Sequence, residues 1–233
     1  MPGIRSADRD SLSADLAVRE PRQQRTREQW SRVLDAGVAL LEEGGYDAFT
    51  IAALCERAQV PPRALYARTD TKDGLFLAVY ERGMSRVLAD HAVFADAELW
   101  GHDDHAHLVE LAVRRLVSIF IDHEAFLRAV VLISNAHPEV LRRGAAYVEA
   151  IRDLFVSVLR TERTRPASGQ SHDLELCFSL VFSAMVVRIA YGPGFGPSGD
   201  TETLTRDLVT MAQRLLLPSR VDLGREVQAE GGR

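Results

Sequence analysis

Residues 50–72, TIAALCERAQVPPRALYARTDTK, carry the signals for two short helices joined by a tight turn. The hydroxyl of Thr50 can accept a hydrogen bond from an otherwise unpaired backbone N–H, which makes Thr50 a good helix start. Apolar side chains then follow at helical spacing over residues 51–58. The two consecutive prolines that come next are compatible with the first turn of a helix, where the N–H that proline lacks has no partner anyway. A second helix is therefore predicted at about residues 62–68.

The second of these helices has the composition of a helix that contacts another molecule. An isolated helix of fewer than roughly 12 residues is marginal, so this one must be docked, and Leu65 can anchor it. The remaining side chains are small, basic or phenolic and point largely outward; they are Arg63, Ala64, Tyr66, Ala67 and Arg68. A docked short helix of this kind is what a helix-turn-helix needs to read the major groove of DNA.

Short motifs in and around this stretch resemble the N-terminal DNA-binding domain of TetR-family transcriptional repressors. They are Gly45-Tyr46, Phe49-Thr50-Ile51, Ala58-Gln59-Val60, Ala64-Leu65-Tyr66 and Lys72-Asp73-Gly74-Leu75. The resemblance is ordered and gapless over about residues 25–87. Beyond that region the chain resembles the family in its length and helical character, with a weak likeness around His137-Pro138-Glu139.

Three positions depart from the family's pattern. Pro61 lies where the family usually has a serine or threonine cap, and Ala67 lies where a polar or aromatic reading residue is common. Thr69 replaces the usual phenylalanine that packs the end of the recognition helix. The resemblance therefore implies the fold without implying which operator sequence is read.

The resemblance implies a homodimer whose recognition helices enter successive major grooves of a pseudo-palindromic operator. The half-sites of such an operator are about 34–36 Å apart, so a small change in head spacing loses both contacts together. The resemblance also implies that a small molecule, expected to be apolar, binds in the larger domain. This effector would tilt the helix predicted at residues 72–91 and release the DNA. The protein is then a ligand-responsive repressor.

Specific roles on DNA are hypotheses from the residue types. Arg63 is expected to read bases, with two hydrogen bonds to a guanine. Ala64 and Ala67 would allow close approach or contact a thymine methyl group. The residues expected to bind phosphates are Thr50, Tyr66 and Lys72, and Pro62 and Arg68 complete the expected DNA-binding set. An alternative for Tyr66 is that it packs its own helix against the core.

The net charge of −5 is unevenly distributed along the 233 residues. Residues 1–72 contain 11 basic and 11 acidic side chains, and the remainder contains 17 basic and 22 acidic ones. Local positive charge near the phosphates matters more than the total, so DNA binding is compatible with this balance. Lys72 is the only lysine. No apolar run approaches 18 residues and the N-terminus lacks a signal-peptide core, so no membrane span and a cytoplasmic location are expected.

No strand-like alternation is present, so the fold is predicted to be all-α with about nine helices. The predicted organisation is a disordered leader at 1–21, a helix-turn-helix domain at 22–71, a helical ligand-binding and dimerisation domain at 72–217, and a flexible tail at 218–233. The helices are expected at about 23–43, 51–58, 62–68, 72–91, 106–121, 124–136, 138–161, 172–191 and 200–217.

The helix predicted at 172–191 is apolar almost all round, which suggests that one face packs on a second copy. The homodimer is thus expected to form through the last two helices. Candidates for the wall of an apolar effector pocket are Phe120, Phe126, Val130, Ser134, Phe155, Phe178 and Phe182. For each of them plain core packing is the alternative, and for Ser134 it is capping of a helix end.

Other classes of function find little support in the sequence. It contains no nucleophile elbow, HExxH motif, phosphate loop or cluster of paired carboxylates, so neither an enzyme nor a cofactor is expected. The histidines and aspartates of residues 100–107 could suggest a metal site, but a loop that caps the next helix through Asp103 or Asp104 is favoured. The alternative function is a helical protein-interaction scaffold that has lost DNA binding.

Overall fold

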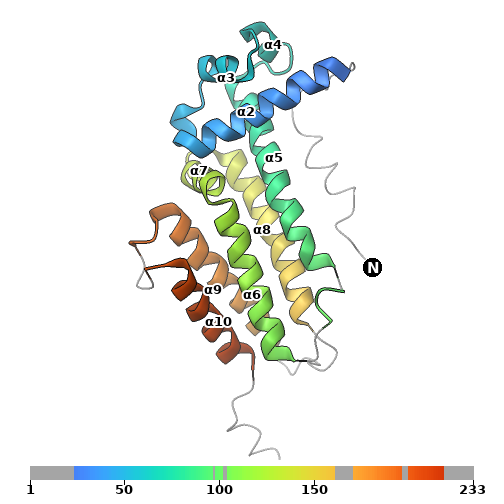
Figure 1. The fold of residues 1–233 in the computed structure, drawn as a ribbon, viewed down its shortest axis with the longest axis vertical. Helices are drawn as coiled ribbons and strands as arrows, with labels where there is room; N and C mark the ends of the chain where they lie inside the picture. Colours follow the sequence, from blue (N-terminus) through green and yellow to red (C-terminus); the bar gives the residue numbers. More distant parts are fainter. Residues whose placement is uncertain (1–23, 97, 102–103, 161–169, 196–198, 218–233) are drawn as a thin grey trace, which may run out of the picture. The chain divides into compact units, whose positions relative to one another are not determined.

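The computed structural model describes residues 24–96, 98–101, 104–160, 170–195 and 199–217. This described part consists of nine α-helices and one short 3-10 helix, without strands (Figure 1). The elements are α2 (Gln24–Ala48), α3 (Ile51–Ala58), α4 (Pro62–Tyr66), α5 (Lys72–His91), η1 (Ala92–Ala95), α6 (His105–Asp122), α7 (Glu124–Ser134), α8 (Pro138–Leu159), α9 (Gln170–Tyr191) and α10 (Thr201–Leu216). The predicted all-α fold is confirmed. The predicted leader at 1–21 and tail at 218–233 lie outside the described residues.

Several helices begin with a side-chain cap, and the caps Thr50 and Asp104 are ones that the sequence suggested. The Thr50 hydroxyl oxygen accepts a hydrogen bond from the Ala53 N–H at 3.1 Å, and so caps α3. Thr71 caps α5 in the same way by accepting from the Gly74 N–H at 3.0 Å. Asp104 accepts from the first turn of α6, at 2.9 Å from the Ala106 nitrogen. The other proposed cap, Asp103, lies outside the described residues.

The ends of the helices differ more from the prediction. The helical geometry of α2 is interrupted at Gly44 and at Gly45, whose φ of +65° favours glycine, which is where the first helix was predicted to end. α4 ends at Tyr66, two residues earlier than predicted. The chain leaves this helix in a tight turn in which the N–H groups of Arg68 and Thr69 both bond to the Leu65 carbonyl.

The described residues group into two compact units, which are described separately. Unit 1 contains the residues up to Asp90 together with His123–Val148. Unit 2 contains His91–Asp122 and the residues from Glu149 onward. These units are defined by compactness, whereas the predicted boundary between residues 71 and 72 separates a DNA-binding domain from a ligand-binding domain. That boundary therefore remains a prediction.

Unit 1 is built around α2, which packs against α3 and α7. An aromatic cluster fills the space beside the helix-turn-helix, where the Phe76 ring lies edge-on to Tyr46 at 4.9 Å and to Phe49 at 5.7 Å. Two glycines permit close helix contact. A Cβ at Gly37 of α2 would overlap Val79 of α5, and a Cβ at Gly83 of α5 would overlap the Phe126 ring of α7.

A buried charge cluster joins α5 to the first half of α8 within unit 1. Arg143 is only 1% exposed, and its guanidinium contacts Glu139 at 2.5 Å and Glu81 at 2.6 Å. The Tyr147 hydroxyl donates to the other Glu81 oxygen at 2.5 Å. Burial raises the pKa of Tyr147, so this hydroxyl stays protonated and able to donate. An unpaired buried charge would be costly, so the four groups depend on one another.

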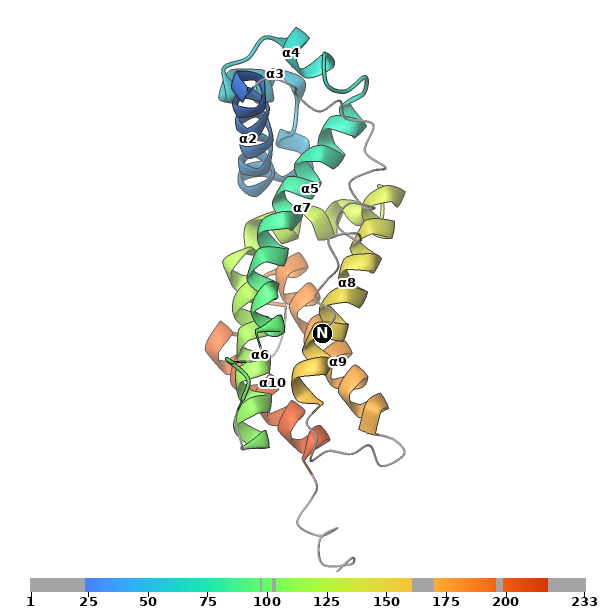
Figure 2. The ribbon, with the colours of Figure 1, turned by 90° about the vertical axis from the view of Figure 1, so that its right-hand side faces the viewer.

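Unit 2 is a helical layer in which α6 lies beside α9 and α10 (Figures 1 and 2). α6 and α10 are antiparallel, because Arg114 pairs with Glu202 at 3.3 Å while Gln213 donates to the Ala106 carbonyl at 3.0 Å. A row of phenylalanine contacts forms its core, with successive ring centroids 5.3–6.0 Å apart in the order Phe94, Phe155, Phe178, Phe182 and Phe120.

Residues His172–Tyr191 of α9 are long and apolar enough to cross a membrane by length and composition alone, with a mean hydropathy of 1.7. The core helix of a folded domain passes the same test, and α9 packs against α6 and α10 within its unit. The absence of a membrane-spanning helix therefore remains a prediction.

Close packing at Gly37 predicts a strong effect of a single methyl group. Gly37→Ala should lower the free energy of unfolding by about 1–3 kcal/mol, because the added Cβ overlaps Val79. Urea unfolding followed by circular dichroism measures this. Gly144→Ala is the matched control, since a Cβ there meets nothing within 4 Å and should stabilise α8 by up to about 1 kcal/mol. A similar result for both variants would contradict the steric explanation.

The carboxylate of Glu139 on α8 predicts that the stability of the protein depends on pH. Hydrogen bonding to Arg142, and then to Arg143, lowers the pKa of Glu139 from 4.5 to about 2. A depressed carboxyl pKa adds stability above pH 4.5 that is lost as the pH falls through about 2. Wild type should therefore be more stable than Glu139→Gln near neutral pH, and the difference should narrow across that window. Urea unfolding midpoints at several pH values test this, and a difference that does not change with pH would refute it.

Candidate nucleic-acid interface

The turn between α3 and α4 is fixed by the backbone. Gln59 adopts the left-handed conformation, with φ of 55°, and ends α3. The Val60 N–H then donates to the Cys55 carbonyl at 3.0 Å, and Pro61 leads into α4 with an extended backbone and no side-chain cap. Leu65 is 0% exposed, which confirms that it anchors the five-residue helix α4.

The predicted DNA-binding residues lie at the surface of unit 1. Exposed side chains are Thr50, Pro62, Arg63, Tyr66, Ala67 and Lys72, and the half-buried ones are Ala64 and Arg68. Tyr66 is 50% exposed, so only part of its ring packs inward. Within the described part of the chain, no acidic side chain lies within salt-bridge distance of Arg63. These residues are thus accessible in the structure, while their contacts with DNA remain a prediction.

Two side chains at the edges of this surface are oriented by neighbours. The Thr50 oxygen accepts the cap hydrogen bond, which leaves its hydroxyl hydrogen available for another acceptor. The Lys72 ammonium lies over the Tyr46 ring, 4.8 Å from its centroid, and 6.0 Å from that of Phe49. A cation held over aromatic faces is attracted to them, so Lys72 has a preferred position at the start of α5.

Ion pairs connect the helices that carry this surface. Arg57 of α3 makes a two-pronged pair with Glu43 of α2, with both N–O distances at 2.5 Å. Asp35 of α2 accepts from Arg82 at 2.9 Å and from Arg86 at 2.5 Å, both on α5. These arginines stabilise the domain, which distinguishes them from Arg63.

The departure at position 69 has a local explanation. Thr69 is 3% exposed, and its hydroxyl donates to the Thr71 carbonyl at 3.1 Å. A Cβ at Gly74 would lie 2.5 Å from the Thr69 oxygen. A small buried residue and a glycine therefore fill the corner between α4 and α5 that the family fills with phenylalanine.

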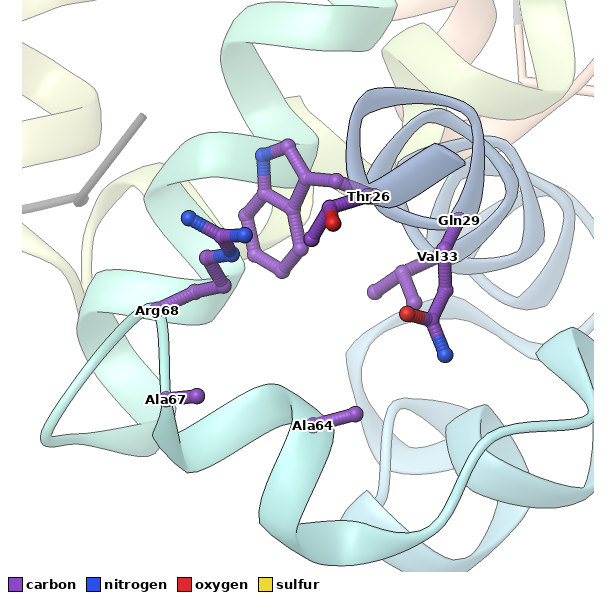
Figure 3. Close-up of a pocket in the computed structure, with 7 residues that line it drawn as sticks. Thr26, Gln29, Val33, Ala64, Ala67 and Arg68 are labelled. Carbon is purple, nitrogen blue, oxygen red and sulfur yellow. The ribbon is translucent and has the colours of Figure 1, made fainter. Parts of the chain in front are cut away.

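Sequence reasoning missed a cavity of about 140 Å³ between α2 and α4 (Figure 3). It is lined by Thr26, Gln29, Trp30 and Val33 of α2, by Ala64 of α4, and by Ala67 and Arg68 of the turn that follows α4. The α2 residues are spaced three or four apart, so they share one face of the helix. That spacing was visible in the sequence, but its opposition to α4 was not.

The predicted effector residues fall into two groups. Phe120, Phe155, Phe178 and Phe182 belong to the phenylalanine row of unit 2. The other group, on α7 of unit 1, is Phe126, Val130 and Ser134. Ser134 donates to the Val131 carbonyl at 2.7 Å, as a residue at a helix end does. A pocket formed by these residues remains a prediction.

Metal binding has no support within the described ranges. They contain no group of three or more His, Cys, Asp or Glu side chains that could hold a metal ion. Of the run at 100–107, His102 and Asp103 lie outside those ranges, and Asp104 serves as a helix cap.

A family model described as "Bacterial regulatory proteins, tetR family" matches residues 33–79. The chain is also similar to the HTH-type transcriptional repressor KstR of Mycobacterium tuberculosis (strain ATCC 25618 / H37Rv), with 35% identity over 74 residues. That match covers 32% of this chain and spans only 34% of the relative's length. The predicted family resemblance is thus confirmed in the region that carries the helix-turn-helix.

Solved structures of TetR-type regulators have a similar fold over most of the chain. A TetR-family transcriptional regulator from Mesorhizobium loti MAFF303099 has a TM-score of 0.66 at 15% identity and covers 83% of this chain and 98% of its own. A TetR regulator from Haloarcula marismortui ATCC 43049 has a TM-score of 0.61 at 15% identity and covers 81% and 96%. Residues 33–79 thus match the model of the tetR family, and the chain has the fold of these solved TetR-type regulators.

Proposed function

We propose that this protein is a cytoplasmic transcriptional repressor that binds a pseudo-palindromic DNA operator as a homodimer and leaves it when a small apolar effector binds. The observation that carries this proposal is α4, which Leu65 docks while Arg63 and Tyr66 stay exposed. The similar protein from Mycobacterium tuberculosis bears the name of a repressor. The fold and the family are those of regulators, and we propose no catalytic activity.

In this proposal Arg63 reads base edges from α4. Its guanidinium can donate two parallel hydrogen bonds to O6 and N7 of a guanine in the major groove. An arginine without an acidic partner among the described residues loses no ion pair when it binds DNA. Ala67 is exposed and small, so it lets α4 approach the bases closely.

The phosphate contacts would lie on either side of α4. Thr50 can donate its hydroxyl hydrogen, Tyr66 its phenolic hydrogen and Lys72 its ammonium protons. Such contacts set the register of the protein on the duplex and carry no sequence information. Each basic contact also releases counterions, so affinity should fall steeply with salt.

Dimerisation through α9 is supported by an exposed apolar stripe in unit 2. Leu176, Leu180, Val187 and Tyr191 are 36%, 44%, 40% and 63% exposed, and their spacing places them on one side of the helix. A second copy that covers this stripe, with α10 beside it, would remove it from water. Two recognition helices would then be available for two half-sites.

The effector response would act through α5, the helix that follows the DNA-binding segment. Within unit 1, α5 is linked to α2 by Asp35 and to α8 by the Arg143 cluster. A ligand can shift such an arrangement only by its different affinity for the two states. The effector itself is expected to be small and apolar because the candidate residues are mostly phenylalanines.

The reader role of Arg63 predicts a loss of affinity with relaxed specificity. Arg63→Ala should weaken operator binding by about 1–3 kcal/mol and should reduce discrimination between base substitutions in the half-site. Fluorescence anisotropy with DNA from upstream of the protein's own gene, over a series of salt concentrations, measures both effects.

Arg152→Ala is the matched control, because Arg152 of α8 pairs with its neighbour Asp153 and lies in unit 2. An equal loss for all DNA sequences in Arg63→Ala would exclude base reading by Arg63. If the wild-type protein bound no DNA at any salt concentration, the protein would be a helical scaffold instead.

The proposed dimer predicts that a charge on the α9 stripe separates the two copies. Leu180→Asp should reduce the mass in solution from twice 25.8 kDa to 25.8 kDa, since a carboxylate would be buried without a partner. Sedimentation velocity at about 10 µM detects the change, and dissociation constants of dimers commonly lie far below that. Leu132→Asp is the control, because Leu132 is 59% exposed on α7. A wild-type protein that sediments as a monomer would refute the dimer.

A further inference from the structure

We propose that the cavity between α2 and α4 binds a small aromatic carboxylate, a ligand with one flat ring and one anionic end. The cavity lies within unit 1, and it shares no residue with the predicted effector set. Figure 3 shows Ala64 of α4 and the following Ala67 and Arg68 on one side of it, opposite residues of α2.

The size of the cavity limits the ligand to one ring. Its volume is about 140 Å³. An engineered apolar cavity of about 150 Å³ binds benzene, whereas sites for drug-sized ligands usually measure about 300–1,000 Å³. A single ring therefore fills the space, and a short acidic group would extend to the open edge.

One part of the lining suits a ring. Val33 is 1% exposed, and the methyl groups of Ala64 and Ala67 add apolar surface from α4. Trp30, which is half-buried, adds a flat indole that a second ring can stack against in an offset or edge-on arrangement. The small side chain at Ala67 keeps this space open, because a larger residue would enter it.

The other part of the lining suits a carboxylate. The Arg68 guanidinium has five N–H donors, so it can give two charge-assisted hydrogen bonds to the two carboxylate oxygens beside the interaction that it already makes. Thr26 and Gln29 supply a hydroxyl and an amide, both of which can donate. A site that is mostly apolar with a few converging polar groups is the usual design for a small ligand.

The surrounding charge also favours an anion. Residues 24–33 of α2 contain three arginines and one glutamate, and residues 62–68 contain two arginines and no acid. A local excess of positive charge raises the concentration of anions at the surface. A neutral ring would not be attracted by this positive charge. The charge therefore favours the proposed carboxylate ligand over the apolar effector expected elsewhere.

Occupation of this site has a consequence for DNA binding. The ligand would contact Ala64 of α4 and the following Ala67 and Arg68, and all three belong to the expected DNA-binding set. A carboxylate held by Arg68 would compete with a DNA phosphate for the same guanidinium. The ligand should therefore lower the affinity for the operator, in addition to any effect of an effector elsewhere.

The test is an NMR titration of the ¹⁵N-labelled full-length protein with benzoate. The chain has two tryptophans, and the spectrum of Trp100→Phe identifies the indole N–H signal of Trp30. The Trp30 signal should shift saturably in the millimolar range that about nine ligand atoms allow. Trp100 lies in unit 2 and its signal should stay in place. The absence of a saturable shift, or equal shifts of both signals, would overturn the proposal.

Two further compounds separate the ring from the charge. Benzamide keeps the ring without the charge, and inorganic phosphate keeps the charge without the ring. Each should bind at least about tenfold more weakly than benzoate. If phosphate bound as well as benzoate, the cavity would be a general anion site, such as one for the DNA backbone, and the aromatic part of the proposal would fail.

Two variants test the residues. Ala67→Leu should abolish the shift by filling the cavity, whereas Ala145→Leu, at an exposed position of α8, should leave it unchanged. Arg68→Met should weaken benzoate binding by about tenfold and leave the weak binding of benzamide as it was. If thermal unfolding shows that Ala67→Leu is destabilised, the comparison of benzoate binding by wild type and Arg68→Met still tests whether the cavity binds the carboxylate. Equal benzoate binding by wild type and Arg68→Met would overturn the proposal.

The ligand site and the proposed repressor function fail independently. The Trp30 titration is done without DNA, so a saturable shift would support the site even if the protein bound no operator. In the DNA assay, benzoate should raise the apparent dissociation constant of the wild-type protein, and benzamide at the same concentration should raise it less. Operator binding that benzoate does not change would contradict the competition at Arg68.

Discussion

The burial of Leu65 is the contact on which the candidate DNA-reading surface depends. α4 has five residues, too few to be stable alone, and Leu65 is its one fully buried side chain. Burial of a leucine contributes about 1.5–3 kcal/mol. The turn from Gln59 to Pro61 fixes how the chain enters the helix. The exposed side chains of α4 are therefore held only as firmly as this anchor.

Around that anchor, small residues set the distances between helices. Gly37 allows α2 to approach Val79, and Gly83 allows α5 to approach the Phe126 ring. The buried guanidinium of Arg143 holds α5 to the first half of α8. Val79 and Gly83 are four residues apart and share one face of α5, so α5 has steric contacts on that face and an ionic contact through Glu81 on roughly the opposite one. A helix held in this way moves as a whole or not at all, because packed interfaces deform little.

The sequence predicts what depends on near neighbours and misses what depends on distant ones. Thr50 could be assigned as a cap because a cap bonds within the next turn. Leu65 could be assigned to the core because it is the one large aliphatic side chain of a short helix. The cavity between α2 and α4 could not be predicted, since Gln29 and Ala67 meet only in the folded chain. Similarly, the overlap at Gly37 depends on Val79, which is distant in sequence.

The position of Lys72 makes it a natural chemical handle. It carries the only side-chain amine of the protein, and it is exposed at the start of α5 beside the Tyr46 ring. Reagents that acylate or reductively methylate amines would therefore modify one side chain per molecule, at the edge of the helix-turn-helix. A fluorophore or isotope label on this side chain would lie on this surface without any engineered cysteine, and the α-amino group of the chain is the other amine that such reagents modify.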